Sequence, residues 1–146
     1  MSANRRTTLV ASIGYQERSV GELIDALHEF DIEKVIDIRE LPLSRRKGFS
    51  KTTLGKHLAQ AGITYRHLRE AGNPYRKLKA SIERCLDLYG KHLTTNPGVV
   101  DTLASELRGQ RVAILCYERQ HEDCHRSVLI EALEDSGRRF KLVEVD

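Results

Sequence analysis

The chain has 146 residues, of which 40% are hydrophobic and 31% are charged, and its formal net charge is +3. This balance excludes an intrinsically disordered chain, which would be poorer in apolar residues, and a membrane-spanning protein, which would contain long uncharged apolar runs. We expect one domain over residues 1–146, because a chain of this length can bury a real hydrophobic core.

Targeting signals and cysteine usage suggest where the protein works. Residues 1–6 lead straight into a strand-like run and contain no apolar core of a signal peptide. The three cysteines are an odd number and too few for a disulfide scaffold. We therefore expect free thiols, a cytoplasmic location and no membrane partner.

Apolar runs alternate with helix-like segments along the chain. Continuous apolar runs are typical of strands buried on both faces, whereas apolar residues spaced i, i+3, i+4 and i+7 are typical of helices. In chain order these patterns predict a strand at 8–13, a helix at 20–30, a strand at 34–38, a helix at 51–61, a strand at 63–68, helices at 80–93 and 99–107, a strand at 112–117, a helix at 124–136 and a strand at 141–145. We expect an α/β fold, with a mainly parallel sheet of about five strands and helices on both faces.

Capping residues bound two of the predicted helices. Ser19 and Glu22 have the spacing of a capping box, in which each side chain accepts a hydrogen bond from the other residue's backbone. Ser50 is the expected N-cap of the helix at 51–61, and Gly62 is its expected C-cap.

Positive charge is concentrated in the middle of the chain. Residues 39–84 hold twelve lysines and arginines and three acids, a net charge of +9, and the remaining residues carry −6. This asymmetry favours an anionic partner, either a phosphate-bearing small molecule or a nucleic acid. A solvated charged surface is the alternative.

Polar and reactive residues follow most of the predicted strands. Tyr15, Asp37–Arg39, His67 and Cys116–Glu118 stand at the strand ends, which in an α/β sheet form the edge where ligands bind. Cys124–Arg126 begins the next helix, and a helix N-terminus attracts anions and lowers the pKa of a thiol. We expect these groups to form one site at that edge.

The loop after the second strand is basic. It contains Ser44, Arg45 and further basic residues, while Gly48 permits a tight turn and Phe49 can anchor the loop to the core. Because arginine suits bidentate contact with phosphate or carboxylate, we interpret this loop as a substrate-binding lid. A solvated loop is the alternative.

The sequence also shares a set of short motifs with a known family. The motifs are Ser12-Ile13-Gly14-Tyr15, Ile36-Asp37-Ile38-Arg39, Pro42-x-Ser44-Arg45, Gly48-Phe49-Ser50, Ala61-Gly62-Ile63-x-Tyr65-x-His67-Leu68, Gly72-Asn73, Leu115-Cys116-Tyr117-Glu118 and Cys124-His125-Arg126. On these residues the chain resembles the bacterial and archaeal family called domain of unknown function 488. One departure is His121, where the family often has proline. The resemblance implies the α/β fold and the strand-end site, and it implies no reaction.

The favoured function is a small enzyme acting on a phosphate-bearing substrate, a nucleotide or a nucleic-acid component. We expect Cys124 or His125 to act as nucleophile or proton-transfer group, with Asp37 and Glu118 assisting, in a hydrolase or transferase reaction. The expected substrate- and anion-binding residues are Tyr15, Arg39, Ser44, Arg45, Tyr65, His67, Asn73 and Arg126. Structural ion pairs of Asp37 with Arg39 and of Glu118 with Arg126 are the alternative.

Two other functions stay open, and the pattern assigns no cofactor and no oligomeric state. The first is a non-catalytic nucleic-acid-binding module that uses the 39–84 segment. The second is a metal or redox site, in which Cys116, Cys124 and His125 would supply ligands with Glu118 or Asp37 as a fourth. The spacing is not a recognised zinc pattern, so we assign no metal ligand. Cys116 and Cys85 are interpreted as core residues.

Overall fold

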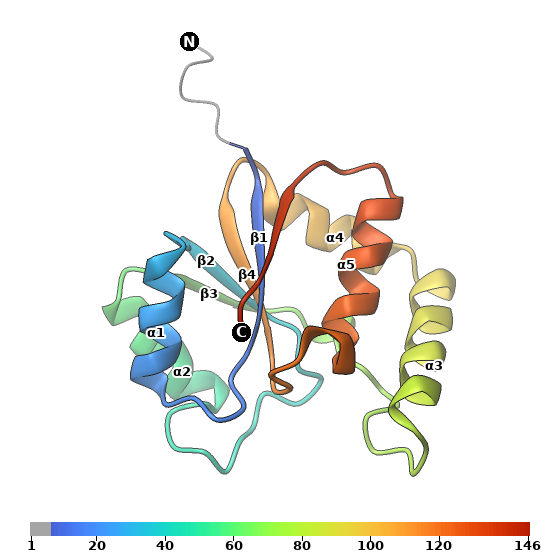
Figure 1. Ribbon diagram of the computed structural model, residues 1–146, viewed down its shortest axis with the longest axis horizontal. Helices are drawn as coiled ribbons and strands as arrows, with labels where there is room; N and C mark the ends of the chain where they lie inside the picture. The colour runs from blue at the N-terminus through green and yellow to red at the C-terminus, as the bar shows by residue number, and fades with distance from the viewer. Residues whose placement is uncertain (1–6) are drawn as a thin grey trace.

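Five parallel strands form one sheet in the computed structural model, which describes residues 7–146 (Figure 1). The elements are β1 (Leu9–Gly14), α1 (Val20–Glu29), β2 (Lys34–Asp37), α2 (Lys51–Gln60), β3 (Thr64–His67), α3 (Ile82–Thr95), α4 (Gly98–Leu107), β4 (Arg111–Cys116), α5 (His125–Asp135) and β5 (Lys141–Glu144). The predicted fold class is confirmed, and the predicted boundaries differ by one or two residues. The expectation about a signal peptide concerns residues 1–6, which lie outside the described part of the chain.

The strand order is β3-β2-β4-β1-β5, so β4 lies between two strands that precede it by more than 70 residues. The register places Gly14 beside Cys116 and Asp37 beside Leu115, which brings the carboxyl ends of β1, β2 and β4 to one edge. From that edge the chain leaves β1 toward α1 on one face and leaves β4 toward α5 on the other (Figure 1). Such a divergence opens a crevice, which is where ligands bind in open α/β sheets.

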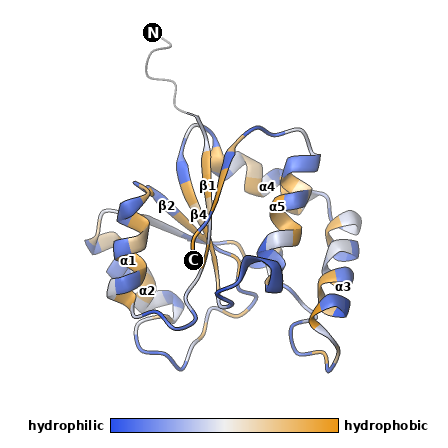
Figure 2. Cartoon of the chain, in the orientation of Figure 1, coloured by the Kyte–Doolittle hydropathy of each residue, from blue (hydrophilic) through white to orange (hydrophobic). Residues whose placement is uncertain are grey.

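Helices cover both faces of the sheet. α1 and α2 pack on one face through Leu23, Leu27, Leu54 and Leu58. On the other face α4 and α5 contribute to a second apolar cluster, and α3 packs beside α5, farther from the sheet (Figure 1). Figure 2 shows that β1 and β4 are largely hydrophobic, as strands covered on both faces must be. No helix within residues 7–146 is long and apolar enough to cross a membrane.

The predicted capping residues lie at the helix ends, but only Ser19 caps its helix as predicted, because Ser50 does not bond its helix and Ala61, not Gly62, is the C-cap of α2. Ser19 Oγ accepts from Glu22 N at 3.1 Å and Glu22 Oε1 accepts from Ser19 N at 2.8 Å, which confirms the capping box. Ser50 occupies the N-cap position of α2, but its hydroxyl bonds the backbone of Ser44 instead of the helix. Gly62 follows the C-cap residue of α2 with φ +79°, a left-handed conformation that favours glycine.

Candidate functional site

A cavity of about 510 Å³ opens at the carboxyl edge of the sheet, a volume typical of small-molecule sites. Its lining comes from strand ends, from the loops that follow β2, β3 and β4, and from the first turns of α3 and α5. The lining includes Tyr15, Arg39, Leu43, Asn73, Arg76, Leu78, Cys85, Cys116, Tyr117, Glu118 and His125. The cavity is thus the crevice that the strand order predicts.

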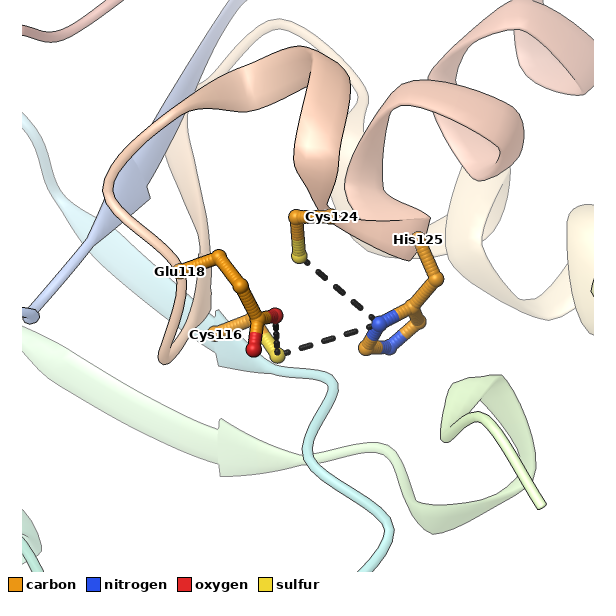
Figure 3. Close-up of side chains that lie close together, drawn as sticks. All are labelled: Cys116, Glu118, Cys124 and His125. Carbon is orange, nitrogen blue, oxygen red and sulfur yellow. Dashed lines mark hydrogen bonds between the residues drawn. The ribbon is translucent and has the colours of Figure 1, made fainter. Parts of the chain in front are cut away.

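Four side chains with metal-binding atoms meet at this edge (Figure 3). Cys116 ends β4, Glu118 lies in the following loop, Cys124 is the N-cap of α5 and His125 is its first residue. The Nδ1 atom of His125 lies 3.8 Å from Cys116 Sγ and 3.7 Å from Cys124 Sγ. Cys116 Sγ lies 3.9 Å from Glu118 Oε1, and one ligand atom from each of the four residues lies within 4.8 Å of the others. Thiolate, imidazole and carboxylate are the groups that bind zinc and related metals.

The imidazole of His125 is held in one orientation. Its Nε2 atom lies 2.9 Å from the carbonyl oxygen of Ile38, and because a carbonyl can only accept, Nε2 carries the proton. In the neutral ring Nδ1 then presents a lone pair to the two sulfur atoms. Tyr89 packs edge-on against the imidazole at a centroid distance of 4.9 Å, and its hydroxyl donates to Ala71 O at 2.6 Å.

Cys124 is buried, with 1% of its surface exposed, and it does not line the cavity. Its Sγ accepts a hydrogen bond from Arg126 N at 3.4 Å, as expected of a helix N-cap. Burial raises the pKa of the Cys124 thiol well above its usual value, and the adjacent Cys116 raises it further. The expected lowering of this pKa by the helix N-terminus is therefore outweighed by desolvation.

Arg126 connects the start of α5 to β1 and to the loop after β4 through hydrogen bonds. Its guanidinium is fully buried: Nε donates to Ser12 Oγ at 2.8 Å and Nη2 donates to Glu118 O at 2.7 Å. Ser12 Oγ also bonds Nδ1 of His121 at 2.7 Å, a contact that proline at position 121 could not make. A Cβ atom on Gly14 would lie 1.8 Å from Glu118 O, so glycine is required where β1 meets this loop.

A second network joins the ends of β2 and β3. Arg39 Nη2 pairs with Asp37 Oδ2 at 2.7 Å, and its Nη1 donates to Phe49 O at 2.7 Å and to Tyr15 Oη at 3.3 Å. Tyr65 Oη donates to Asp37 Oδ2 at 2.5 Å, and burial together with the charge of Asp37 raises the pKa of Tyr65 well above its usual value. Burial opposes the charge on Arg39, but the hydrogen bonds and charge of Asp37 outweigh it and raise the pKa of Arg39. Asp37 and Arg39 thus form the buried ion pair that the sequence left as an alternative.

The structure brings part of the predicted site together at the cavity. Tyr15, Arg39, Asn73, Glu118 and His125 line it. The other predicted residues do not line it, namely Asp37, Ser44, Arg45, Tyr65, His67, Cys124 and Arg126. Most of these residues contact the lining residues from the protein side; for example, His67 Nε2 bonds Arg39 O at 2.7 Å. Arg45 is exposed on the loop after β2.

Other cavity residues are absent from the predicted site, and Cys85, interpreted from the sequence as a core residue, is half-buried at the cavity instead. Arg76 and Leu78 come from the segment after β3, and Cys85 comes from α3. That segment reaches the cavity because the chain passes close to the loop after β2, where a Cβ on Gly72 would lie 2.4 Å from Glu40 Cα. Cys116 is buried, as a core residue would be, and it also lines the cavity. The position of Cys116 at the end of a predicted strand is the feature of the sequence that could have placed it at the cavity.

Fold and site together define a small parallel α/β protein with a cavity at the carboxyl edge of the sheet, beside a cluster of two thiols, an imidazole and a carboxylate. The chain belongs to the family described as domain of unknown function DUF488, whose model matches residues 19–133. Comparison with curated proteins and with solved structures gave no match. Membership confirms the resemblance seen in the sequence.

Proposed function

We propose that this protein is an enzyme that acts on a phosphate-bearing substrate, a nucleotide or a nucleic-acid component, bound in the cavity at the sheet edge. The observation that carries the proposal is the make-up of the cavity. The lining combines Glu118 and His125, whose side chains can transfer protons or bind metals, with two arginines, Arg39 and Arg76. The reaction class would be hydrolysis or group transfer.

Two exposed basic loops beside the cavity support an anionic substrate. One loop contributes Leu43 to the lining and the other contributes Leu78. Their exposed basic residues are Arg45, Arg46, Lys47, Arg76, Lys77 and Lys79. Clustered charges of one sign around a cleft raise the local concentration of oppositely charged ligands.

The lining residues suggest a division of labour. Arg39 is a fixed, charge-compensated member of the lining, because its guanidinium pairs with Asp37 and is also held by the carbonyl oxygen of Phe49. Arg76 lies near the surface and pairs with Glu40 at 3.2 Å, so it can turn toward a phosphate. Tyr117 is 43% exposed and offers a ring face on which a base could stack.

Replacement of Arg76 tests the proposal directly. Arg76→Ala should weaken the binding of a nucleoside monophosphate about tenfold, equivalent to about 1.4 kcal/mol, because a charge-assisted contact is lost. Isothermal titration calorimetry on wild type and variant would measure this, followed by assays of phosphate release. The matched control is Arg138→Ala, which removes another exposed, ion-paired arginine, bonded to Asp101 at 3.4 Å and absent from the cavity lining.

Two results would count against an enzyme pocket. An equal loss in both variants would mean that net charge, not the cavity, attracts the ligand. Binding confined to oligonucleotides, unaffected by Arg76→Ala and falling steeply with salt, would instead support the nucleic-acid-binding module that uses residues 39–84.

We also propose that the protein is located in the cytoplasm. Cys85, Cys116 and Cys124 are all free thiols, which suits a reducing compartment.

A further inference from the structure

We propose that Cys116, Cys124 and His125 bind a divalent transition metal ion of the zinc type, with Glu118 as an exchangeable fourth ligand at the cavity. Metal binding does not depend on the identity of the substrate, so it can be tested separately from the proposed function. Binding to the two thiols would release their two protons to solvent, leaving two thiolates on the ion.

The separations between the candidate ligand atoms match a tetrahedral site. With Zn–S bonds near 2.3 Å and Zn–N bonds near 2.0–2.1 Å, a sulfur and a nitrogen ligand stand about 3.6 Å apart. His125 Nδ1 lies 3.7 Å from Cys124 Sγ and 3.8 Å from Cys116 Sγ. One ring nitrogen therefore faces two sulfur atoms at nearly equal distances, as a shared ion requires (Figure 3).

Hydrogen bonds and packing hold the candidate ligand atoms in fixed positions. The Nε2–H group of His125 donates to Ile38 O, which fixes the tautomer that leaves Nδ1 free to bind a metal. Cys124 Sγ accepts the backbone N–H of Arg126 at the N-terminus of α5, which fixes the position of the sulfur atom, and a bound divalent ion would itself drive the loss of the thiol proton. Cys124 and His125 are both buried, so their ligand atoms are held in place by packing.

Ligand chemistry and exposure indicate the kind of metal and its role. Two sulfur atoms and an imidazole favour zinc or a similar transition metal over magnesium or calcium, which prefer oxygen. Glu118 is half-buried and lines the cavity, so its carboxylate can give way to water or substrate. Catalytic zinc sites commonly combine three protein ligands with one such open position.

A disulfide between Cys116 and Cys124 would be the competing use of these sulfur atoms. It would require an S–S bond of about 2.05 Å and would leave no role for His125 or Glu118. The imidazole nitrogen directed at both sulfur atoms favours the metal.

Metal content and cobalt spectroscopy of the full chain test the proposal. Protein purified under reducing conditions should bind about one zinc or cobalt ion, and the cobalt form should show thiolate-to-metal charge-transfer absorption. Cys116→Ser and Cys124→Ser should each weaken metal binding more than about tenfold. Cys85→Ser is the matched control, because Cys85 is the third free cysteine and lines the same cavity outside the cluster, and it should bind as wild type does.

Each outcome of these metal-binding experiments either supports the metal site or overturns it. Absence of metal binding by reduced wild type, binding without thiolate absorption, or equal loss in Cys85→Ser would overturn the proposal. A Cys116–Cys124 disulfide that forms in air while the reduced protein binds no metal would establish the redox alternative.

If the serine variants do not fold, wild type still decides the question. Zinc should then protect Cys116, the cluster thiol that lines the cavity, from alkylation, with chelator reversing the protection, while Cys85 reacts equally with and without metal. Nucleotide titrations of the zinc-loaded and chelated protein separate the two proposals, because either binding event can be present without the other.

Discussion

Gly14 stands where β1 meets the loop that carries Glu118, and the distance between the two segments is set by its missing side chain. A Cβ would lie 1.8 Å from Glu118 O, so Gly14→Ala must push the loop away from β1. We expect the variant to lose about 1–3 kcal/mol of unfolding free energy, the usual effect of overpacking. Urea denaturation followed by circular dichroism would measure it.

The control for that experiment is Gly98→Ala. A Cβ on Gly98 would have no heavy atom within 4 Å, and the residue begins α4, where alanine is a better helix former. Its stability should be unchanged or slightly higher. Equal stability of Gly14→Ala and wild type would mean that the loop adjusts freely and does not fix the position of Glu118.

For single residues, the sequence predicts which side chains lie at the edge of the sheet better than it predicts which other residues they contact. Tyr15, Arg39 and Glu118 follow strand ends, so their place at the sheet edge could be predicted. Burial of Arg126 could not, because its partner Ser12 is 114 residues away in the chain. Arg45 has the same side chain and remains exposed, since its loop offers it no comparable pocket.

At the level of elements, the serines at the N-cap positions show that the sequence predicts where a helix begins but not which atoms the capping side chain bonds. Ser19 and Ser50 both occupy N-cap positions, but only the Ser19 hydroxyl bonds its own helix. Ser19→Ala should therefore lower the free energy of unfolding by about 1 kcal/mol, and Ser50→Ala by less. Urea denaturation of both variants compares them, and a larger loss for Ser50→Ala would show that its bonds to Ser44 matter more than the capping box.

Strand identity could be predicted from the sequence, but strand order could not. β1 and β4 are continuous apolar runs, which indicates burial on both faces. Nothing in such a run says which neighbour it pairs with, because pairing depends on the packing of the whole sheet. The insertion of β4 between β1 and β2 is what brings Cys116 to the cavity and Cys124 close to it.

On the scale of the whole molecule, two loops of the basic middle segment lie at the carboxyl edge of the sheet. The loops after β2 and β3 both belong to residues 39–84, which carry the net charge of +9, and both line the cavity. Of the twelve basic residues in this segment, Arg39 and Arg76 line the cavity, and Lys77 and Lys79 flank its lining residue Leu78, so part of the positive charge lies at the candidate site.

Charge reversal at the cavity rim tests whether this placement matters. Lys77→Glu with Lys79→Glu should weaken the binding of a nucleoside monophosphate by about tenfold at low ionic strength, because two attractive charges become repulsive. The matched control is Arg139→Glu with Lys141→Glu, which changes the net charge equally at exposed positions leading into the amino end of β5. Calorimetric titrations at several salt concentrations would compare the two variants.

Salt should remove the difference between these variants, since the screening length falls from about 30 Å at 0.01 M to about 10 Å at 0.1 M ionic strength. Both lysines are exposed, so their contribution is of the kind that salt screens. A loss confined to the rim variant at low salt would locate the anion at the cavity. An equal loss in both variants would show that the anion responds to total charge, and the basic segment would then have no directed role at this edge.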